Sequence, residues 1–523
     1  MQHTALFPPC ISNCDAKVEC GSWAPVAGTT CPLNVCCDQY GYCGVTSEFC
    51  STGCQSNCDQ PPATALSNDS LYLTGNQRDV SFIRTDSITH LYVAFGYITP
   101  DTYEIFPIPG SDMATFLQIM QPKHNAPGLR IYLSLGGWSF SHNGTDGQPV
   151  FGDLSSTPAK RSTFITNLAS FMRQYGFDGV DLDWEYPGAP DRGGTTADTA
   201  NYVALLRDIR TWWDAQTSGW GLSFTAPTSY CYLRWFDIGN MTQYADWVNL
   251  MTYDLHGSWD SPEDDIGSFK ITFRFSDLSA SPLMASVALD LLWRNNVPAN
   301  KVNLGLGFYG RSYTLSDPSC SSPGCPFSDP GIAGSCTGTA GILSYDEIET
   351  TLSMYQLTTY YDEIAGVNYF SWNQDQWVSF DDARSLKNKV DYANQNGLLG
   401  IFIWALDLDD MNHDALNAVL YSKGGLGAFK QQDGVGLNDF TNYTRGSGAC
   451  FLGECSPTPG CTGPYQAVGH QIRCDQQGMY RQVCCPNTNT PNPNICTWRG
   501  GRCKATVFER LMTNSTPQPT LYL

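Results

Sequence analysis

The chain has 523 residues and carries 29 Lys and Arg against 50 Asp and Glu, a formal net charge of −21 at pH 7. This acidic balance argues against nucleic acid and against an anionic membrane surface as partners, because both attract positive protein surfaces. Charged residues make up 15% of the chain and aromatic residues 13%, and no apolar run reaches the roughly 18 residues of a membrane span. A surface poor in charge and rich in flat rings suits a neutral polar ligand such as a sugar.

The 22 cysteines fall into three groups with even counts: ten in residues 10–58, four in 231–336 and eight in 450–503. Dense, even clusters are typical of disulfide-stapled modules in an oxidising compartment. Zinc binding is the alternative, although no Cys-x-x-Cys pair occurs and the chain has only 7 His. Five N-x-S/T sequons fit a secretory route; they lie at Asn68, Asn143, Asn240, Asn442 and Asn514. We therefore expect a secreted protein, extracellular or in a cell wall, although no signal peptide is visible in this chain.

Changes in composition divide the chain into six segments. They are an N-terminal segment (1–19), a cysteine-rich module (20–58), a linker (59–69), a long segment of alternating patterns (70–425), a second cysteine-rich block (446–503) and a tail expected to be disordered (504–523). Residues 20–58 are too few to fold on an apolar core alone, so disulfides are expected to stabilise them.

Between about 70 and 425, short apolar runs alternate with amphipathic stretches such as 161–176 and 383–397. The runs are 90–98, 129–137, 179–184, 222–227, 247–254, 302–308 and 397–407. Strands that alternate with helices indicate a parallel sheet of an α/β protein, and the length favours a (β/α)₈ TIM barrel over a doubly wound sheet. The only candidate for an eighth strand is SLYLT at 70–74, and 311–374 is expected to be a small α+β insertion.

The sharpest feature is FDGVDLDWEYP at 177–187. On a strand, Asp181, Asp183 and Glu185 point to one face, toward the C-terminal end of a barrel interior. Like charges buried so closely share a proton, which raises the pKa of one carboxyl into the range that a general acid needs. A calcium site or a solvated acidic turn is the alternative, and the apolar spacers between the carboxylates disfavour the turn.

These residues resemble the signature of glycoside hydrolase family 18, the chitinase family, whose pattern D-x-x-D-x-D-x-E is matched by Asp178, Asp181, Asp183 and Glu185. LSLGGW (133–138) and MTYD (251–254) resemble the motifs of the third and sixth barrel strands, and Trp404 matches the tryptophan of the eighth. The resemblance covers most of 85–425. It implies a retaining, substrate-assisted hydrolysis of β-1,4 bonds between N-acetylglucosamine units, without metal or other cofactor.

The resemblance also implies a role for each matched residue. Glu185 is the general acid and base, Asp183 orients the substrate's acetamido group, and Asp181 shares a proton with Asp183. Tyr253 is expected to donate a hydrogen bond to the acetamido oxygen and Asp254 to contact the sugar at the cleaved bond. Four further residues are expected to bind substrate: Trp404, Trp138, Tyr186 and Asp178. Trp404 could instead pack in the core, and Trp372 and Trp377 could either line the cleft or pack.

Residues 20–58 resemble the hevein-type chitin-binding module in all eight cysteines. Eight cysteines allow 105 pairings, and the family pattern implies Cys20–Cys37, Cys31–Cys43, Cys36–Cys50 and Cys54–Cys58. Family ligand positions fall on Asp38, Tyr40, Tyr42 and Phe49; a disulfide knot without ligand is the alternative. Cys10 and Cys14 are expected to pair with each other. The block at 450–503 resembles the tail of fungal class V chitinases related to killer-toxin subunits.

We therefore predict a monomeric chitinase that binds chitin and chitooligosaccharides. One departure bears on activity, because the aromatic motif of the family's first strand is missing between 59 and 90, and a barrel without its first strand is left open. A catalytically impaired chitin-binding lectin, an endo-β-N-acetylglucosaminidase acting on N-glycans and a structural wall protein are the alternatives.

Overall fold

The computed structural model describes most of the chain between residues 17 and 421. The described residues are 17–58 without 46, the backbone of 70–75, 84, 88–107, 119–120, 122–123, 126, 128–216, 219–259, 282–363 without the side chains of 282–287, 365–421, and the backbone of 451–452, 465–473 and 480–486. Cys10, Cys14, the linker 59–69 and the tail 504–523 lie outside these residues, as do three of the sequon asparagines, Asn68, Asn442 and Asn514.

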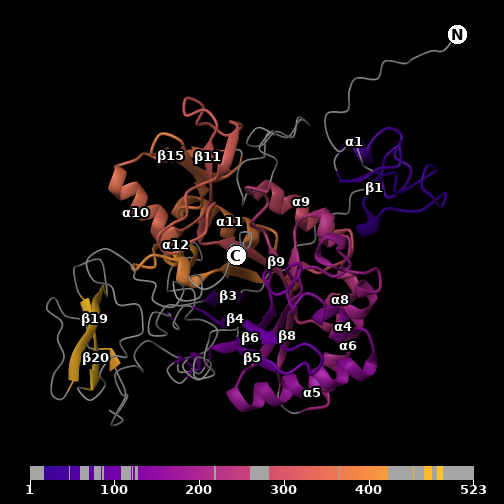
Figure 1. The fold of residues 1–523 in the computed structure, drawn as a ribbon, viewed down its shortest axis with the longest axis horizontal. Helices are drawn as coiled ribbons and strands as arrows, with labels where there is room; N and C mark the ends of the chain where they lie inside the picture. The colour runs from indigo at the N-terminus through magenta and orange to yellow at the C-terminus, as the bar shows by residue number, and fades with distance from the viewer. Residues whose placement is uncertain are drawn as a thin grey trace. The chain divides into compact units, whose positions relative to one another are not determined.

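Eight parallel strands form a closed ring (Figure 1). In chain order they are β3(Ser70–Gly75), β4(His90–Ile98), β6(Arg130–Gly136), β7(Gly179–Asp183), β8(Gly221–Pro227), β9(Trp247–Met251), β10(Val302–Gly307) and β17(Gly400–Trp404). The ring closes because β3 pairs in parallel with β17 on one side and with β4 on the other. The chain thus has a TIM barrel, and the segment at 70–74 supplies the first strand. A short strand β5(Ile105–Pro107) is added antiparallel to the end of β4.

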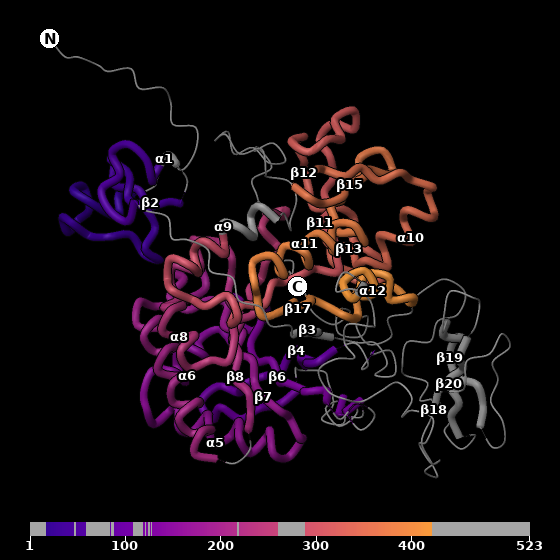
Figure 2. Tube along the Cα trace, turned by 180° about the vertical axis from the view of Figure 1, so that it is seen from behind, coloured from indigo at the N-terminus to yellow at the C-terminus, as the bar shows by residue number. Residues whose placement is uncertain are grey.

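Helices between the strands cover the outside of the barrel, as Figures 1 and 2 show for α5, α6 and α8. In chain order the helices are α4(Val150–Ser155), α5(Pro158–Tyr175), α6(Asp198–Asp214), α7(Tyr230–Leu233), α8(Ile238–Tyr244), α9(Pro282–Trp293), α11(Ala383–Gln395) and α12(Asp414–Tyr421). Local sequence fixes the limits of α5. Thr157 caps its first turn by accepting a hydrogen bond from Lys160 N, and Gly176 ends it in the left-handed conformation.

The segment between β10 and α11 forms an antiparallel sheet beside one helix, so the expected α+β insertion is present and extends a few residues further at each end. Its elements are β11(Tyr309–Leu315), β12(Phe327–Pro330), β13(Ile342–Ser344), α10(Tyr345–Tyr355), β14(Tyr360–Asp362), β15(Val367–Trp372) and β16(Gln376–Phe380). A disulfide joins Cys320 to Cys325. Trp377 is fully buried in the core of this sheet and donates to Ser321 O, so it packs and does not line a cleft.

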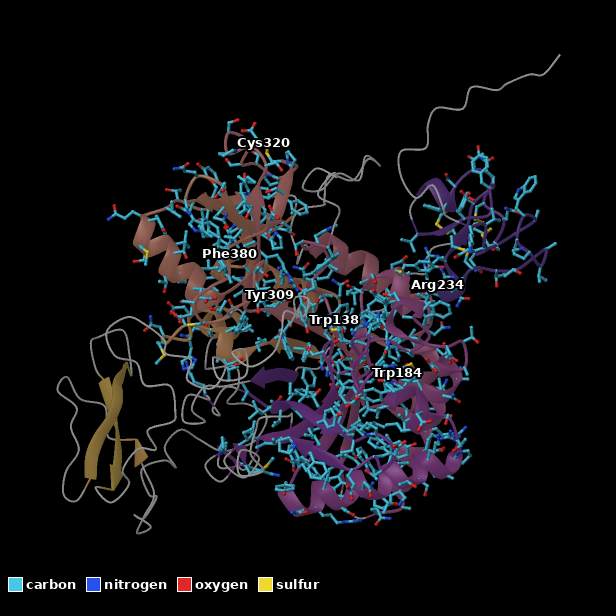
Figure 3. All side chains as sticks on the ribbon, viewed as in Figure 1. Trp138, Trp184, Arg234, Tyr309, Cys320 and Phe380 are labelled. Carbon is cyan, nitrogen blue, oxygen red and sulfur yellow. A yellow bond between two sulfur atoms is a disulfide. The ribbon has the colours of Figure 1, made fainter. Side chains whose placement is uncertain are left out.

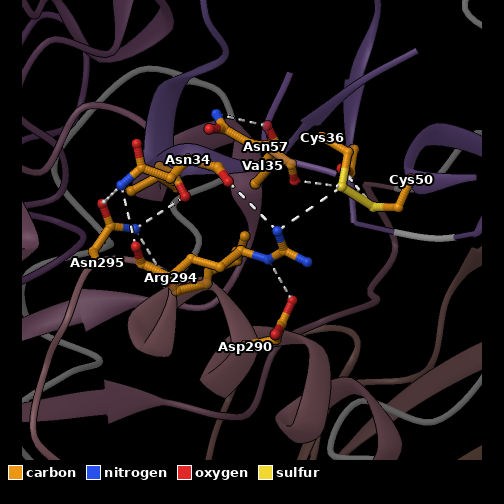
Figure 4. A network of polar contacts seen from close by, with 11 residues as sticks. Asn34, Val35, Cys36, Cys50, Asn57, Asp290, Arg294 and Asn295 are labelled. Atoms are coloured by element: carbon orange, nitrogen blue, oxygen red, sulfur yellow. Dashed lines mark hydrogen bonds and ion pairs between the residues drawn. A yellow bond between two sulfur atoms is a disulfide. The ribbon is translucent and has the colours of Figure 1, made fainter. Parts of the chain in front are cut away.

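The N-terminal module contains β1(Cys36–Cys37), β2(Cys43–Gly44), the one-turn helix α1(Ser47–Cys50) and a 3-10 turn at Pro32–Asn34. Its four disulfides are Cys20–Cys37, Cys31–Cys43, Cys36–Cys50 and Cys54–Cys58, the same pairs that the family pattern implies. Every described cysteine of the module is thus in a disulfide, which leaves no thiolate for zinc. Polar contacts run from this module to the end of α9 (Figure 4): Asn34 donates to Arg294 O and Asn295 donates to Leu33 O, both at 3.1 Å.

The residues from Leu426 to Pro517 form a separate unit. Its described strands are β18(Phe451–Leu452), β19(Tyr465–Arg473) and β20(Tyr480–Pro486), which pair antiparallel in the order β18, β20, β19. Among the described residues of the whole chain, no helix is both long and apolar enough to cross a membrane.

Candidate active site

Three carboxyl groups are buried together at the C-terminal end of β7, where active sites of TIM barrels lie. Asp181 and Asp183 belong to the strand, and Glu185 follows it by two residues. Their exposed fractions are 2%, 6% and 7%. Strand alternation directs all three toward the interior, as the sequence predicts.

Asp181 is held by four hydrogen bonds from neighbouring strands. Ser134 and Thr225 donate to its Oδ2, each at 3.0 Å, and Ser223 and Asn249 donate to its Oδ1 at 2.6 and 3.0 Å. The register explains this arrangement, because Asp181 is directly opposite Ser134 on β6 and Ser223 on β8. A carboxylate has about four acceptor positions, and all are occupied here, so sharing a proton with Asp183 requires the loss of one donor. A ring of donors also does not fit calcium, which needs oxygen lone pairs.

Asp183, unlike Asp181, has an oxygen that accepts no hydrogen bond from the described residues. Its Oδ1 is buried and has no hydrogen-bond partner among the described residues. Burial, then the charges of Glu185 and Asp181, raise the pKa of Asp183 well above its usual value. Burial and the acidic neighbours therefore favour the neutral form of Asp183 over its carboxylate.

Glu185 is tuned by a different set of neighbours. Burial raises its pKa to about 7, a hydrogen bond with Tyr186 and the charge of Arg192 oppose the rise, and Asp254 adds to it. The carboxyl is thus protonated in mildly acidic solution and can donate that proton near neutral pH. This is the property required of a general acid.

The ends of β9 and β10 add a second group of polar side chains. The ring of Tyr253 is buried and lies 6.2 Å from that of Tyr309, and Asp254 forms an ion pair with Arg311 at 2.7 Å. Tyr309 and Arg311 are functional candidates that the sequence reading missed. The stretch FYGR directly after an apolar strand could have indicated them, but their approach to Asp254 depends on the fold.

The predicted aromatic residues Trp138, Tyr186 and Trp404 lie at or just after the C-terminal ends of β6, β7 and β17, and Figure 3 labels Trp138. Trp138 follows β6 and is half-buried, and Trp404 at the end of β17 is half-buried and stacked on Phe95 with 5.5 Å between ring centres. Tyr186 is buried and stacked on Tyr232 at 4.2 Å. Trp138 and Trp404 therefore retain exposed surface, whereas one face of the Tyr186 ring is already covered.

The expectation that Asp178 binds substrate does not fit its position. Asp178 precedes β7, at the opposite end of the strand from Glu185. Its carboxylate accepts hydrogen bonds from Ile131 N at 2.8 Å and from Lys123 at 2.7 Å. These contacts join β7 to the start of β6, which is a structural role at the N-terminal face of the barrel.

The N-terminal module presents aromatic rings to solvent. Tyr40 is 64% exposed and Tyr42 is 36% exposed. Asp38 Oδ1 accepts hydrogen bonds from the backbone N–H groups of both tyrosines and so fixes the turn that carries them. Phe49 is half-buried. Trp23 is a further exposed ring that the sequence reading missed, although its place near the first cysteine of the module was visible.

Comparison with known proteins agrees with this architecture. Residues 68–409 match the family model of glycosyl hydrolases family 18, well over half of the chain, and residues 19–58 match that of chitin recognition proteins. The chain therefore belongs to glycosyl hydrolase family 18 and carries a chitin recognition module of the hevein type.

Several curated relatives are similar over long stretches. A probable chitinase of Penicillium expansum, LysM18, is 32% identical over 80% of this chain and 31% of its own length. Chitotriosidase-1 of Mus musculus is 32% identical over 62% of this chain and 68% of its own length. The killer toxin subunits alpha/beta of Kluyveromyces lactis are 29% identical over 76% of this chain and 36% of their own length. The chain thus spans about a third of the length of these fungal relatives.

Two solved structures have a fold similar to that of this chain. The Group IV chitinase of Ostrinia furnacalis has a TM-score of 0.60 and 26% identity, covering 68% of this chain and all of its own. A chitinase-like agglutinin of Robinia pseudoacacia has a TM-score of 0.56 and 26% identity, covering 67% of this chain and 98% of its own. Proteins of this fold therefore include an agglutinin.

Proposed function

We propose that this chain is a chitinase that cleaves β-1,4 bonds between N-acetylglucosamine units by a retaining, substrate-assisted mechanism. The observation that carries the proposal is that three adjacent carboxyl groups have different environments. Asp181 accepts hydrogen bonds at all its acceptor positions, Asp183 has an unpartnered oxygen, and Glu185 has a pKa of about 7. Such an arrangement provides one proton donor and one free acceptor within a single strand end.

In the first step, Glu185 gives its proton to the glycosidic oxygen as the bond from that oxygen to C1 breaks. The acetamido oxygen of the same sugar forms the new bond to C1, and an oxazolinium ion results. The acetamido N–H donates to Asp183 Oδ1, which has no other partner among the described residues. The positive charge of the ion favours the carboxylate form of Asp183, so the proton of Asp183 passes to Asp181, which gives up one of its four donors, and returns when the ring reopens.

In the second step, Glu185 takes a proton from water while the water oxygen attacks C1 and reopens the oxazolinium ring. This regenerates the acid and retains the configuration at C1. Tyr253 donates its hydroxyl hydrogen to the acetamido oxygen, and Asp254, held by Arg311, contacts the sugar. No carboxylate nucleophile and no cofactor enter these steps, and the requirement for a 2-acetamido group restricts the substrate class.

The module at 20–58 directs this activity to polymeric chitin and distinguishes it from an N-glycan-specific enzyme. Tyr40, Tyr42 and Trp23 offer exposed rings on a scaffold stiffened by four disulfides. Asp38 and Phe49 complete the surface. The disulfides also suit an oxidising compartment, so we propose an extracellular or cell-wall location and action as a monomer.

A lectin-like protein is the second candidate, because an agglutinin shares the fold. Turnover of chitotetraose, together with retention on insoluble chitin, decides between them. We expect turnover by the parent, a loss of at least about 100-fold in Glu185→Gln, and equal retention of both proteins. Glu347→Gln is the matched control, since Glu347 is equally buried, at 7% exposed, and lies in the insertion at the start of α10. Retention without turnover in the parent would establish the lectin.

A further inference from the structure

Arg192 is a buried cation beside the candidate active site to which the mechanism assigns no task. It is the last residue of a 3-10 turn at Pro190–Arg192, in the loop that follows β7, and is 6% exposed. No carboxylate among the described residues forms an ion pair with it. A buried guanidinium without a paired carboxylate is costly unless other groups accept its hydrogen bonds.

The guanidinium joins two loops of the barrel. Its Nε donates to the backbone oxygen of Glu185 at 3.0 Å, and its Nη2 donates to the backbone oxygen of Trp138 at 2.6 Å. Its Cζ also lies 3.8 Å from the centre of the Trp138 ring. One side chain thus contacts the backbone of the acid and both the backbone and the ring of the tryptophan.

The loop that carries Arg192 is held in a tight fold by hydrogen bonds and by a glycine. Asp198 closes the base of the loop by accepting hydrogen bonds from Gly188 N and Thr195 N, at 3.1 and 2.8 Å. A Cβ on Gly194 would lie 2.5 Å from Ala189 N, so the tight turn requires glycine there.

We propose that Arg192 is a positioning residue that sets the place of the Glu185 carboxyl and the orientation of the Trp138 ring as one unit. Because the guanidinium covers one face of the indole, a sugar can stack only on the opposite face. The positive charge also opposes the rise of the Glu185 pKa that burial causes, which keeps the acid able to release its proton. The effect on Glu185 rests on the proposed function, because it assumes that Glu185 is the acid. The effect on Trp138 concerns only the binding of a sugar and does not need catalysis.

Two substitutions separate geometry from charge. Arg192→Met removes both, and Arg192→Lys keeps the charge but loses the planar fork that reaches two carbonyls and stacks on a ring. Arg173→Met is the matched control, since Arg173 also lies over tryptophan rings, at 5.3 Å from Trp212 and Trp220, but on the outer helices. Affinity for chitotetraose is measured by calorimetry in the Glu185→Gln background, and the pH dependence of kcat/KM is measured with Glu185 present.

We expect chitotetraose to bind roughly ten-fold more weakly to both Arg192 variants and unchanged to Arg173→Met. The basic limb of kcat/KM should move to higher pH by about 0.5 or more in Arg192→Met and stay in place in Arg192→Lys. Affinities within two-fold of the parent's would overturn the proposal, as would a basic limb unmoved in Arg192→Met. If the Met variant does not fold, the affinity of the Lys variant decides. If the parent lacks turnover, the proposed function fails, and the affinity measurement still decides this inference.

Discussion

The raised pKa of Glu185 predicts that Glu185→Gln is more stable than the parent, in a pH-dependent way. The folded-state pKa of about 7 lies above the ordinary value of 4.5, so unfolding releases a proton between these values and stability falls as the pH rises from about 4.5 through 7. Glu185 costs the folded state about 3 kcal/mol at pH 8, where its carboxylate is buried, and roughly 1 kcal/mol at pH 5, where folding must take up a proton. Glutamine has no charge to bury, so it removes this cost.

The assay is thermal unfolding of the parent and Glu185→Gln from pH 5 to 8.5. For a barrel of roughly 350 residues the unfolding entropy is about 0.7 kcal/mol/K, so the melting temperature should rise by about 4 °C at pH 8 and by 1 to 2 °C at pH 5. Glu347→Gln is the control and should lose stability at every pH, because Glu347 accepts hydrogen bonds from the backbone N–H groups of Ser344 and Thr337. A Glu185→Gln variant that melts below the parent, or at a constant interval from it, would refute the reasoning.

Three further outcomes follow from other contacts. Asn249→Ala removes one of the four donors to Asp181 and should lower the free energy of unfolding in urea by about 1–3 kcal/mol. Asp181→Asn should lower it at least as much. An unchanged unfolding midpoint in either variant would contradict this. Tyr40→Ala should weaken retention on insoluble chitin about five-fold or more while chitotetraose turnover stays at the parent level, and equal retention would exclude Tyr40 from the binding surface. Glu19 and Arg234 form an ion pair at 2.8 Å with about a quarter to a third of each side chain exposed, so Glu19→Arg should cost roughly 0.2–1 kcal/mol, and adding Arg234→Glu should restore the melting temperature unless the pair contributes nothing.

The barrel could be read from the sequence because its strands are buried on both faces and appear as apolar runs. Six of the seven clear runs contain a whole strand of the structure, and the seventh, 222–227, misses only the first residue of β8. The first strand was the exception, since SLYLT is short and its assignment depends on pairing with both β17 and β4. Such non-local pairing leaves no local pattern. The insertion was recognised as an interruption of the alternation, but its sheet order could not be.

The candidate site was predicted to the extent that it lies on one strand. Asp181, Asp183 and Glu185 share a face by alternation, whereas Asp178 differs in parity from them and precedes the strand. The same alternation could therefore have excluded it from the substrate group. Arg192 and Arg311 could not be found in this way, because each reaches its partner across loops, at Glu185 and Asp254 respectively.

The three carboxyls owe their different proposed roles to their neighbours, since two of them are the same residue type. Asp181 is opposite Ser134 and Ser223 in the register of the barrel, so donors surround it. Asp183 lies two residues further along, and its Oδ1 has no hydrogen-bond partner among the described residues. Glu185 lies beyond the strand, within reach of the loop that carries Arg192. Position along a single strand thus gives the three carboxyls different environments: Asp181 is held by four donors, Asp183 has an unpartnered oxygen, and Glu185 titrates near neutral pH.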